Sequence, residues 1–294
     1  MKTSSFAQYI EEVLKKHIGE SIKLKGAKMA YGGSINECYI LDTNKGNYFI
    51  KRNDAVDFPG MFSEEAKGLI ALRSTQTLRI PEVIEVGHFK SYAFLLLEYL
   101  ERGTPSNAVW DKFGEQLALL HKHSNEHYGW SSENYIGSLN QTNTNFNSWT
   151  EFLIHTRLES QALLALTNKK IDRKLYDKFQ QLYTKLDSVF PVELPAMLHG
   201  DLWSGNFLAL ASGEVAVFDP AIYYGHREMD LAMTRLFGGF NQRFYDAYNA
   251  HYPLINDWQK RVDICQLYPL LVHVNLFGGG YVHQVEMIVK KWTI

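Results

Sequence analysis

The segment Leu198–Pro220 carries the side chains of this sequence that are best suited to chemistry. It reads LHGDLWSGNFLALASGEVAVFDP, and it places Asp201 ahead of Asn206 and Asp219. Carboxylate and amide oxygens are the ligands that Mg²⁺ prefers, and a carboxylate can also accept the proton of an attacking hydroxyl. The same residues are common in turns, so a hairpin with polar turns is the alternative interpretation.

The order and spacing of these residues favour a phosphotransferase. Protein kinases use H-R-D-x-x-x-x-N followed by D-F-G, where the first Asp meets the hydroxyl and the Asn and second Asp hold Mg²⁺. HGDLWSGN keeps His, Asp and Asn at the same relative positions, with Gly200 in place of Arg, and Asp219 follows VAVF but precedes a Pro. Asp201 is therefore the candidate base, Asn206 and Asp219 are the candidate magnesium ligands, and His199 is interpreted as a structural loop residue.

A glycine pair lies between two expected strands near the N-terminus. The sequence YGGSIN at 31–36 includes Gly32, Gly33, Ser34 and Ile35. Paired glycines let backbone N–H groups approach phosphate oxygens closely, although a tight β-hairpin explains such a pair as well. This loop is a candidate nucleotide-covering loop only in combination with the other features.

A lysine and a glutamate follow in the order that protein kinases use. Lys51 ends the run NYFIK, and Glu65 lies in the expected helix FSEEAKGLIALR. In protein kinases a strand lysine pairs with a helix glutamate and contacts the α- and β-phosphates. A solvated strand end and an exposed helix charge are the simpler alternatives for each residue alone. The joint occurrence with the segment 198–220 favours the kinase interpretation.

The elements that must position these residues change character near residue 100. Before it, a helix over 4–18 is followed by short β-rich runs, a helix at 62–73 and the strands PEVIEVGHF and YAFLLLEYL. After it, the apolar period predicts helices at 106–123, 149–166, 172–190, 228–249, 257–277 and 281–291, with short strands only around FLAL and VAVFD. We therefore expect an α+β protein with a small β-rich lobe over 1–100, a mainly helical lobe over 101–294 and a ligand cleft between the lobes.

Composition narrows the class of protein. The 294 residues are 46% hydrophobic and 21% charged, which suits a globular protein with a large core. A net charge of −2 gives no reason to expect nucleic acid or an anionic membrane as partner. Cys38 and Cys265 lie far apart, which leaves no disulfide framework or zinc motif. The N-terminal segment has acidic residues where a signal peptide would be apolar, so we expect a cytoplasmic protein.

Taken together, the motifs resemble one family of kinases. HGDLWSGN, the following DPAIYYGHREMDLAM, and LFGGGY near the C-terminus are similar to the fructosamine-3-kinase (ketosamine-3-kinase) family. GGSIN, MFSEEAKGL, LLLEYL and the series GW…NYIG…Q…N…W at 129–149 also resemble it, so the resemblance covers nearly the whole chain. It implies a protein-kinase-like bilobal fold, with ATP and Mg²⁺ as cofactors. It also implies phosphorylation of ketoamine sugars at the 3-hydroxyl, after which the phosphate eliminates spontaneously and frees the amine, so the implied role is deglycation.

The resemblance also implies roles for individual residues. Lys51, held by Glu65, would contact the phosphates beneath the loop formed by Gly32, Gly33, Ser34 and Ile35. Glu98, Tyr99 and Leu100 would form the hinge at the adenine, and Asp230 would brace the catalytic loop. The candidates for the sugar pocket are Trp130, Trp203, Tyr223 and Arg227, with packing of the catalytic loop as the alternative for Trp203. Some family members carry a redox-active cysteine where this chain has Ser34, so redox control by this loop is not expected.

Two other functions stay open at this point. A kinase of the same architecture could act on an aminoglycoside, a choline-like compound or another small hydroxyl substrate. A nucleotide-binding pseudokinase is the non-enzymatic alternative, but Lys51, Asp201, Asn206 and Asp219 are all present, and inactive relatives usually lose at least one. The preferred ketoamine, and whether it is free or protein-bound, cannot be read from the sequence. We expect a monomer or a weak dimer.

Overall fold

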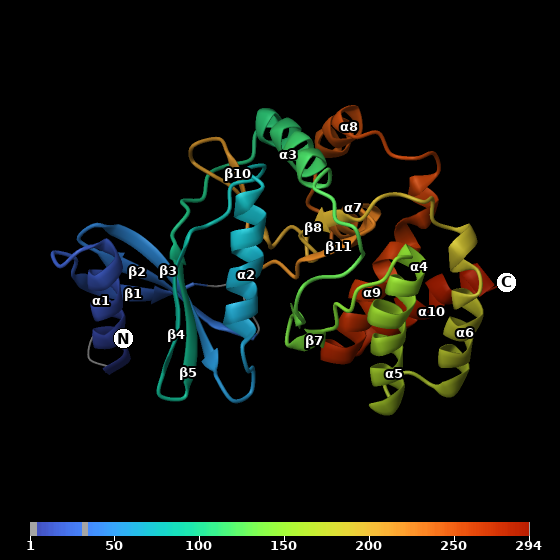
Figure 1. Ribbon diagram of the computed structural model, residues 1–294, viewed down its shortest axis with the longest axis horizontal. Coiled ribbons are helices and arrows are strands. Elements are labelled where there is room, and N and C mark those ends of the chain that lie inside the picture. Colours follow the sequence, from blue (N-terminus) through green and yellow to red (C-terminus); the bar gives the residue numbers. More distant parts are fainter. Residues whose placement is uncertain (1–4, 31–34, 294) are drawn as a thin grey trace. The chain divides into compact units, whose positions relative to one another are not determined.

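The computed structural model describes residues 5–30 and 35–293 (Figure 1). Its contacts divide the chain into two compact units. The first consists of Met1–Pro105 with Leu208–Asp219, and the second of Ser106–Phe207 with Pro220–Ile294. The boundary expected at residue 100 lies close to the first of these junctions, and the structure adds the short segment 208–219 to the first unit.

The first unit is built around a five-stranded antiparallel sheet in the order β1-β2-β3-β5-β4. Its elements are α1(Ser5–Ile18), β1(Leu24–Met29), β2(Glu37–Thr43), β3(Gly46–Asp54), α2(Met61–Ser74), β4(Val83–Phe89) and β5(Tyr92–Glu98). Each pairing of neighbouring strands is antiparallel, as short connections between consecutive strands allow. The predicted N-terminal helix, the helix near 62–73 and the strand-rich texture are confirmed.

The two faces of this sheet are covered by different helices, α1 and α2 (Figure 1). The apolar stripe of α1, with Phe6, Ile10 and Leu14, is buried in one cluster with Ile50 of β3 and Leu96 of β5. Because side chains alternate along a strand, Lys51 points to the face opposite Ile50. That face is the one on which α2 lies, since Glu65 of α2 reaches the Lys51 ammonium group. The sheet therefore separates an apolar layer from the layer that carries charge.

A hairpin from far along the chain completes the first unit. Strands β9(Phe207–Ala209) and β10(Val215–Val217) pair with each other, as predicted for FLAL and VAVF. The backbone of Arg79 donates to Val215 O at 3.3 Å and accepts from Val217 N at 3.1 Å, and Gly103 N donates to Ala209 O at 2.7 Å. These bonds tie the hairpin to the segments around β4 and β5, so its end, Asp219, is placed by the first unit.

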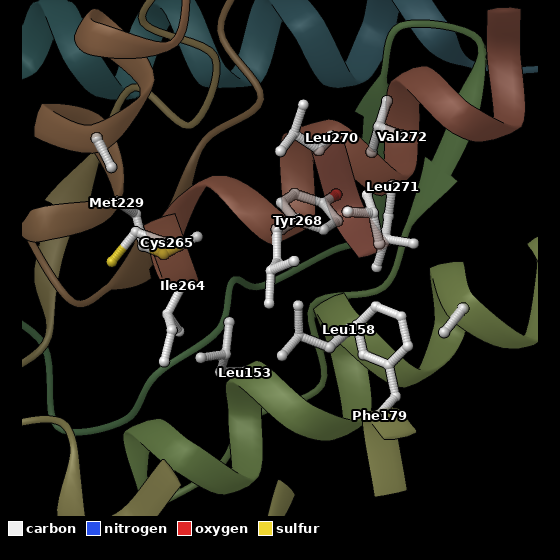
Figure 2. Close-up of a cluster of buried hydrophobic side chains, with 14 of the residues drawn as sticks. Leu153, Leu158, Phe179, Met229, Ile264, Cys265, Tyr268, Leu270, Leu271 and Val272 are labelled. Carbon is white, nitrogen blue, oxygen red and sulfur yellow. The ribbon is translucent and has the colours of Figure 1, made fainter. Parts of the chain in front are cut away.

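The second unit is mainly helical. It contains α3(Asn107–Leu120), β6(Asn134–Ile136), β7(Leu139–Gln141), α4(Trp149–Phe152), a π-helical turn at Leu153–Leu158, α5(Glu159–Thr167), α6(Arg173–Tyr183), a 3₁₀ turn at Leu186–Ser188, β8(Ala196–Leu198), β11(Tyr223–Gly225), α7(Glu228–Leu236), α8(Gln242–His251), α9(Trp258–Phe277) and α10(Gly280–Thr293). Strand β11 pairs with β8, and β6 pairs with β7. Figure 2 shows how α9 supplies Ile264, Tyr268 and Leu271 to the core of this unit. In the chain from 5 to 30 and from 35 to 293, no helix combines the length and the apolarity that a membrane span requires.

Two features of the second unit differ from the sequence-based expectation. The single helix predicted over 228–249 is two helices, α7 and α8, because Gly238 and Gly239 adopt positive φ angles of 71° and 93°. Asn241 then caps α8 by accepting a hydrogen bond from Arg243 N at 3.0 Å. The short strands β6, β7, β8 and β11 were not predicted, because three residues are too few for a period to be recognised.

Candidate active site

Lys51 is a buried cation of the first unit and not a solvated strand end. Its backbone lies opposite Cys38 of β2 and Leu95 of β5, and its side chain is 4% exposed. The ammonium Nζ donates to Glu65 Oε1 at 2.7 Å and also to Asp219 Oδ1. The expected Lys51–Glu65 pair is therefore present, and the aspartate after VAVF joins it as a second anion.

Burial and charge act against each other in this cluster. Burial disfavours the charged form of Lys51, but the carboxylates of Asp219 and Glu65 outweigh it, so the pKa of Lys51 lies above its ordinary value. Burial raises the pKa of Glu65, although the nearby Lys51 charge opposes this, and Asp219 adds to the rise. A lysine that stays charged while largely desolvated suits an anionic ligand such as phosphate, because its charge is weakly screened.

Asp219 adopts a backbone conformation that is uncommon for a residue with a side chain. Its φ is +57°, in the left-handed region, directly after β10. Aspartate tolerates this region better than most residues, but the conformation still costs free energy, and such residues concentrate at functional sites. Its side chain is 38% exposed although one oxygen contacts Lys51. Asp219 thus combines a strained backbone, a cationic partner and access to solvent.

The catalytic loop HGDLWSGN lies in the second unit, directly after β8. The amide Nδ2 of Asn206 donates to Asp201 Oδ2 and to the Asp201 backbone oxygen, both at 2.9 Å. Asp201 N in turn donates to His199 Nδ1 at 3.3 Å, and the ring of His199 is fully buried. Asn206 therefore fixes both the backbone and the carboxylate of Asp201, and His199 supports the loop as expected.

Asp230, at the start of α7, holds the backbone of the same loop. It accepts from His199 N at 2.8 Å and from Gly200 N at 2.9 Å, and it also contacts His121 Nε2 at 3.2 Å. Burial opposes the charge of Asp230, but the hydrogen bonds from His121 and Gly200, with nearby histidine charge, hold its pKa below the ordinary value. Tyr248 of α8 completes the group by contacting His121 Nδ1 at 2.8 Å. The bracing role expected for Asp230 agrees with these contacts.

Gly200, which stands where protein kinases have Arg, is required by space. Its φ is +83°, and a Cβ atom there would lie 2.0 Å from the backbone oxygen of Ala221. The segment after Asp219 thus passes so close to the catalytic loop that no side chain fits between them. The departure from the kinase motif is a packing requirement of this chain.

The comparisons with known proteins agree with this geometry. A family model described as fructosamine kinase matches residues 6–293. The chain belongs to the fructosamine kinase family. A protein of Synechocystis sp. named a probable ketoamine kinase is 38% identical over 288 residues, which cover 97% of this chain and 96% of the relative. A chloroplastic protein-ribulosamine 3-kinase of Oryza sativa subsp. indica is 38% identical over 279 residues, which cover 93% of this chain and 80% of the relative.

Solved structures confirm the predicted fold class. A protein of Thermobifida fusca, provisionally named a fructosamine-3-kinase, matches with a TM-score of 0.87 at 31% identity over 98% of each chain. An aminoglycoside phosphotransferase matches with a TM-score of 0.64 at 15% identity over 96% of this chain and 98% of the other, which shows a shared fold alone. The fructosamine kinase family thus has the protein-kinase-like architecture expected from the sequence, and the prediction of an ATP-dependent phosphotransferase of this family is confirmed.

Beside the catalytic loop, this fructosamine kinase family member carries a group of aromatic rings. The Trp203 ring packs over Gly205, where a Cβ would lie only 2.3 Å from the indole. Trp203 meets Phe237 edge to face at 5.9 Å between ring centroids, and Phe237 lies 5.0 Å from the His273 ring. Trp203 and His273 are half-buried, and Phe237 is 40% exposed. Phe237 and His273 were not singled out from the sequence, and only His273 lies near a noted motif, three residues before LFGGGY.

Two of the four predicted sugar-pocket residues belong to the interior instead. Tyr223 is 1% exposed, and its ring stacks on Phe152 and on the guanidinium of Arg157. Arg227 is 2% exposed, makes two hydrogen bonds of 2.8 Å to Glu193, and donates to the backbone oxygens of 252 and 253. We therefore correct both assignments to structural roles. Both residues follow the catalytic motif closely in sequence, which suggested contact with the sugar. In the structure Tyr223 packs in the core, and the guanidinium of Arg227 is paired with Glu193.

The remaining predicted residues have these places. Trp130 is half-buried, with its ring 5.7 Å from that of Tyr224, so it stays a candidate for the acceptor side. Glu98 ends β5, and its carboxylate accepts from Arg79 and from the backbone N of residue 82 at 3.1 Å. Tyr99 and Leu100 follow it and are half-buried. Gly32, Gly33 and Ser34 lie outside the described residues, and Ile35 is half-buried at their edge.

Each of the two predicted magnesium ligands carries an oxygen of the kind that a hard divalent cation prefers. Asp219 has a carboxylate, and Asn206 has an amide whose Nδ2 donates to Asp201. Mg²⁺ typically takes one or two protein carboxylates together with substrate phosphates, so a complete protein cage is not needed. Among residues 5–30 and 35–293, no group of three or more His, Cys, Asp or Glu side chains is arranged to hold a metal ion.

Proposed function

We propose that this chain transfers the γ-phosphoryl group of ATP to the 3-hydroxyl of ketoamine sugars. The observation that carries the proposal is the orientation of Asp201 by Asn206 within HGDLWSGN, in a chain that belongs to the fructosamine kinase family. The rice relative named a protein-ribulosamine 3-kinase supports the position of phosphorylation and the class of acceptor. The acceptors would be fructosamine- or ribulosamine-type adducts, free or on protein lysines.

Asp201 is proposed as the base that meets the acceptor hydroxyl. The hydroxyl oxygen forms a bond to the γ-phosphorus, the bond from that phosphorus to the β-phosphate oxygen breaks, and ADP leaves. The proton of the hydroxyl passes to Asp201, whose carboxylate Asn206 holds at 2.9 Å. Most of the rate enhancement in such transfers comes from positioning and electrostatics.

The first unit supplies the nucleotide-binding residues in this proposal. Lys51, held by Glu65, would contact the phosphates, and the loop of Gly32, Gly33, Ser34 and Ile35 would cover them. The backbone of Glu98, Tyr99 and Leu100 would meet the adenine. Asn206 and Asp219 would hold Mg²⁺, which, when bound, offsets negative charge on the phosphate oxygens.

Trp203 is proposed as the residue against which the sugar packs. Its ring is braced by Gly205 on one side and by Phe237 at one edge, so it is rigid, yet it remains partly exposed. A rigid, half-exposed aromatic ring beside the base suits a sugar, which presents apolar C–H groups on one face and hydroxyls at its rim. Trp130 is a second candidate for this side.

The product is expected to lose its phosphate spontaneously and to free the amine, so the proposed role is deglycation in the cytoplasm. A direct test measures ATP consumption over a panel of fructosamines, ribulosamines, erythrulosamines and aminoglycosides. We expect turnover with ketoamines only. Turnover with aminoglycosides and none with ketoamines would refute the acceptor class.

The base assignment has its own test. Asp201→Ala should abolish turnover while ATP binding, measured by calorimetry, stays within about twofold, because positioning of the hydroxyl is needed for transfer and not for binding. Asp246→Ala, at an exposed site of α8, is the matched control and should keep wild-type turnover. Full turnover by Asp201→Ala would contradict the assignment.

A further inference from the structure

Buried polar residues of the β6–β7 hairpin have no role in the chemistry described so far. Asn134, Gln141 and Asn143 belong to the series at 129–149 and are 4%, 1% and 2% exposed. Buried amides are costly unless their hydrogen bonds are made, so each should have specific partners. In the register of the hairpin, Asn134 lies directly opposite Gln141.

Gln141 has three hydrogen bonds that leave its amide one orientation. Its Nε2 donates to Asn134 Oδ1 at 2.8 Å and to the backbone oxygen of Ala221 at 3.0 Å. Its Oε1 accepts from the hydroxyl of Tyr268 at 2.7 Å. Both amide protons are used, so a rotation of the amide by 180° would turn Oε1 toward two acceptor oxygens and lose the bonds to Asn134 and Ala221.

Ala221 is the residue on which the catalytic loop rests. Its backbone N donates to His199 O at 2.9 Å, and its oxygen is the atom that leaves no room for a side chain at Gly200. The next carbonyl, that of Ile222, accepts from Asn134 Nδ2 at 2.8 Å. The hairpin side chains thus hold the two consecutive peptides that pass behind the loop of Asp201.

The far side of this network is anchored in the core of the second unit. Asn143 Nδ2 donates to Asn134 Oδ1 at 3.0 Å, and Arg157 Nη2 donates to Asn143 Oδ1 at 2.7 Å. Arg157 is fully buried in the π-helical turn, and Tyr268 lies on α9 among the packed side chains of Figure 2. The charges of Arg157 and Asp201 both act on the Tyr268 hydroxyl, whose pKa burial raises to about 12. The Tyr268 hydroxyl, which bonds to Gln141, is therefore near enough to Asp201 to be influenced by its charge.

We infer that Gln141 is a positioning residue for Asp201 and acts through the backbone of Ala221. The inference rests on the proposed function, in that Asp201 is the group being positioned. A connected buried network in which the amides of Asn134, Gln141 and Asn143 are hydrogen-bonded is rigid, and a rigid support is what holds a base within the tolerance that phosphoryl transfer requires. Asn134 and Tyr268 support Gln141 in this role.

Two glutamine variants separate positioning from stability. Gln141→Leu removes the side-chain hydrogen bond to the Ala221 oxygen. Gln161→Leu is a matched control, since Gln161 is 4% exposed and its Oε1 accepts from Asn275 of α9. We expect Gln141→Leu to lower kcat by about 10- to 100-fold with KM for ATP within about twofold. Gln161→Leu should keep kcat within about twofold at a comparable loss of Tm.

A third variant tests the hydrogen bond itself. Gln141→Glu still accepts from Tyr268 but donates to Ala221 only when protonated, so its kcat relative to wild type should rise as pH falls. If Gln141→Leu does not fold, Tyr268→Phe removes one hydroxyl and should lower kcat about threefold to tenfold. Equal kcat values for Gln141→Leu and Gln161→Leu, or a Gln141→Glu profile parallel to wild type, would overturn the inference.

Hydrogen exchange gives a readout that needs no acceptor. Peptides covering 198–206 and 219–225 should exchange faster in Gln141→Leu than in wild type or Gln161→Leu, because Ala221 N loses its fixed contact with His199. Unchanged exchange in these peptides would overturn the inference whatever the substrate is. A wild-type protein that phosphorylates no ketoamine would contradict the proposed function alone.

Discussion

Lys51→Met is the substitution that best separates catalysis from stability in this chain. Methionine keeps most of the side-chain volume but removes the cation that Glu65 and Asp219 share. Asp219 is partly exposed and can be solvated, whereas the Glu65 side chain is 11% exposed and is left as a buried, uncompensated carboxylate. Breaking a buried ion pair from one side typically costs about 3–5 kcal/mol.

The loss of stability in Lys51→Met cannot exceed the free energy of protonating Glu65, because protonation removes the buried charge. A carboxyl with an ordinary pKa near 4.3 requires about 4 kcal/mol to be protonated at pH 7. Burial already raises the pKa of Glu65, so the folded variant would take up this proton. The folded state then binds one proton more than the unfolded state, and stability falls by about 1.4 kcal/mol for each unit of rising pH. The deficit of Lys51→Met should therefore be about 4 kcal/mol at pH 7 and near 1 kcal/mol at pH 5.

The assay is urea unfolding at pH 5, 6 and 7, together with initial rates of ATP consumption. Lys67→Met is the matched control, because Lys67 is on α2, is 57% exposed and pairs with Glu64. It should change stability by less than about 1 kcal/mol at any pH and leave turnover unchanged. The double variant Lys51→Met/Glu65→Gln should recover most of the stability, because no buried charge remains. Its turnover should stay about 100- to 1,000-fold below wild type.

The double variant also provides the refutation. If it recovers turnover along with stability, Lys51 serves only to neutralise Glu65 and Asp219, and a role toward phosphate is wrong. If the deficit of Lys51→Met does not depend on pH, Glu65 is not the group left uncompensated, and the account of the buried pair fails.

Three further predictions concern the segment 200–219 and the strand beside Lys51. Asp219→Asn keeps a residue tolerant of the left-handed region but loses the charge, so it should weaken ATP binding in Mg²⁺ and not in EDTA; equal dissociation constants in Mg²⁺ would contradict the metal role. Gly200→Ala should reduce kcat at least 100-fold by steric conflict with Ala221, whereas Gly213→Ala, with a similar φ of +81° and open space, should only lower stability by about 1 kcal/mol. Comparable activity in both variants would exclude the steric explanation. Burial and the carboxylates of Asp219 and Glu65 raise the pKa of Cys38 to about 11 from 9.0, although the Lys51 charge opposes the rise. Alkylation of Cys38 at pH 8, followed by mass spectrometry, should therefore be about 100-fold slower than alkylation of a free thiol. A rate near that of a free thiol would show that the Cys38 thiol is not protected.

Much of the fold and part of the site followed from local patterns. The alternation in NYFIK and the helical period of FSEEAKGLIALR predicted β3 and α2, and with them the pair of Lys51 and Glu65. The spacing in HGDLWSGN predicted Asp201 as the base and Asn206 as a magnesium ligand, and the structure shows the two side chains hydrogen-bonded to each other. These contacts are either local or set by one strand–helix unit, so sequence spacing is enough to find them.

The errors and omissions concern contacts that close over long sequence separations. Arg227 looked available for a sugar, but its charge is taken by Glu193, 34 residues earlier in the chain. Tyr223 lies in the core because Phe152 and Arg157 cover it. The contact of Gln141 with Ala221 spans 80 residues, so neither spacing nor period could reveal it. Such pairings depend on how helices pack, which a local pattern does not determine.

The discontinuity of the first unit has a consequence for biosynthesis. Its residues up to 105 leave the ribosome early, but the hairpin that bonds to Arg79 and Gly103 is translated only after the first hundred residues of the second unit. At about 5–20 residues per second, Asp219 is synthesised several seconds or longer after Lys51 and Glu65. The cluster of Lys51, Glu65 and Asp219 can therefore be completed only late in synthesis.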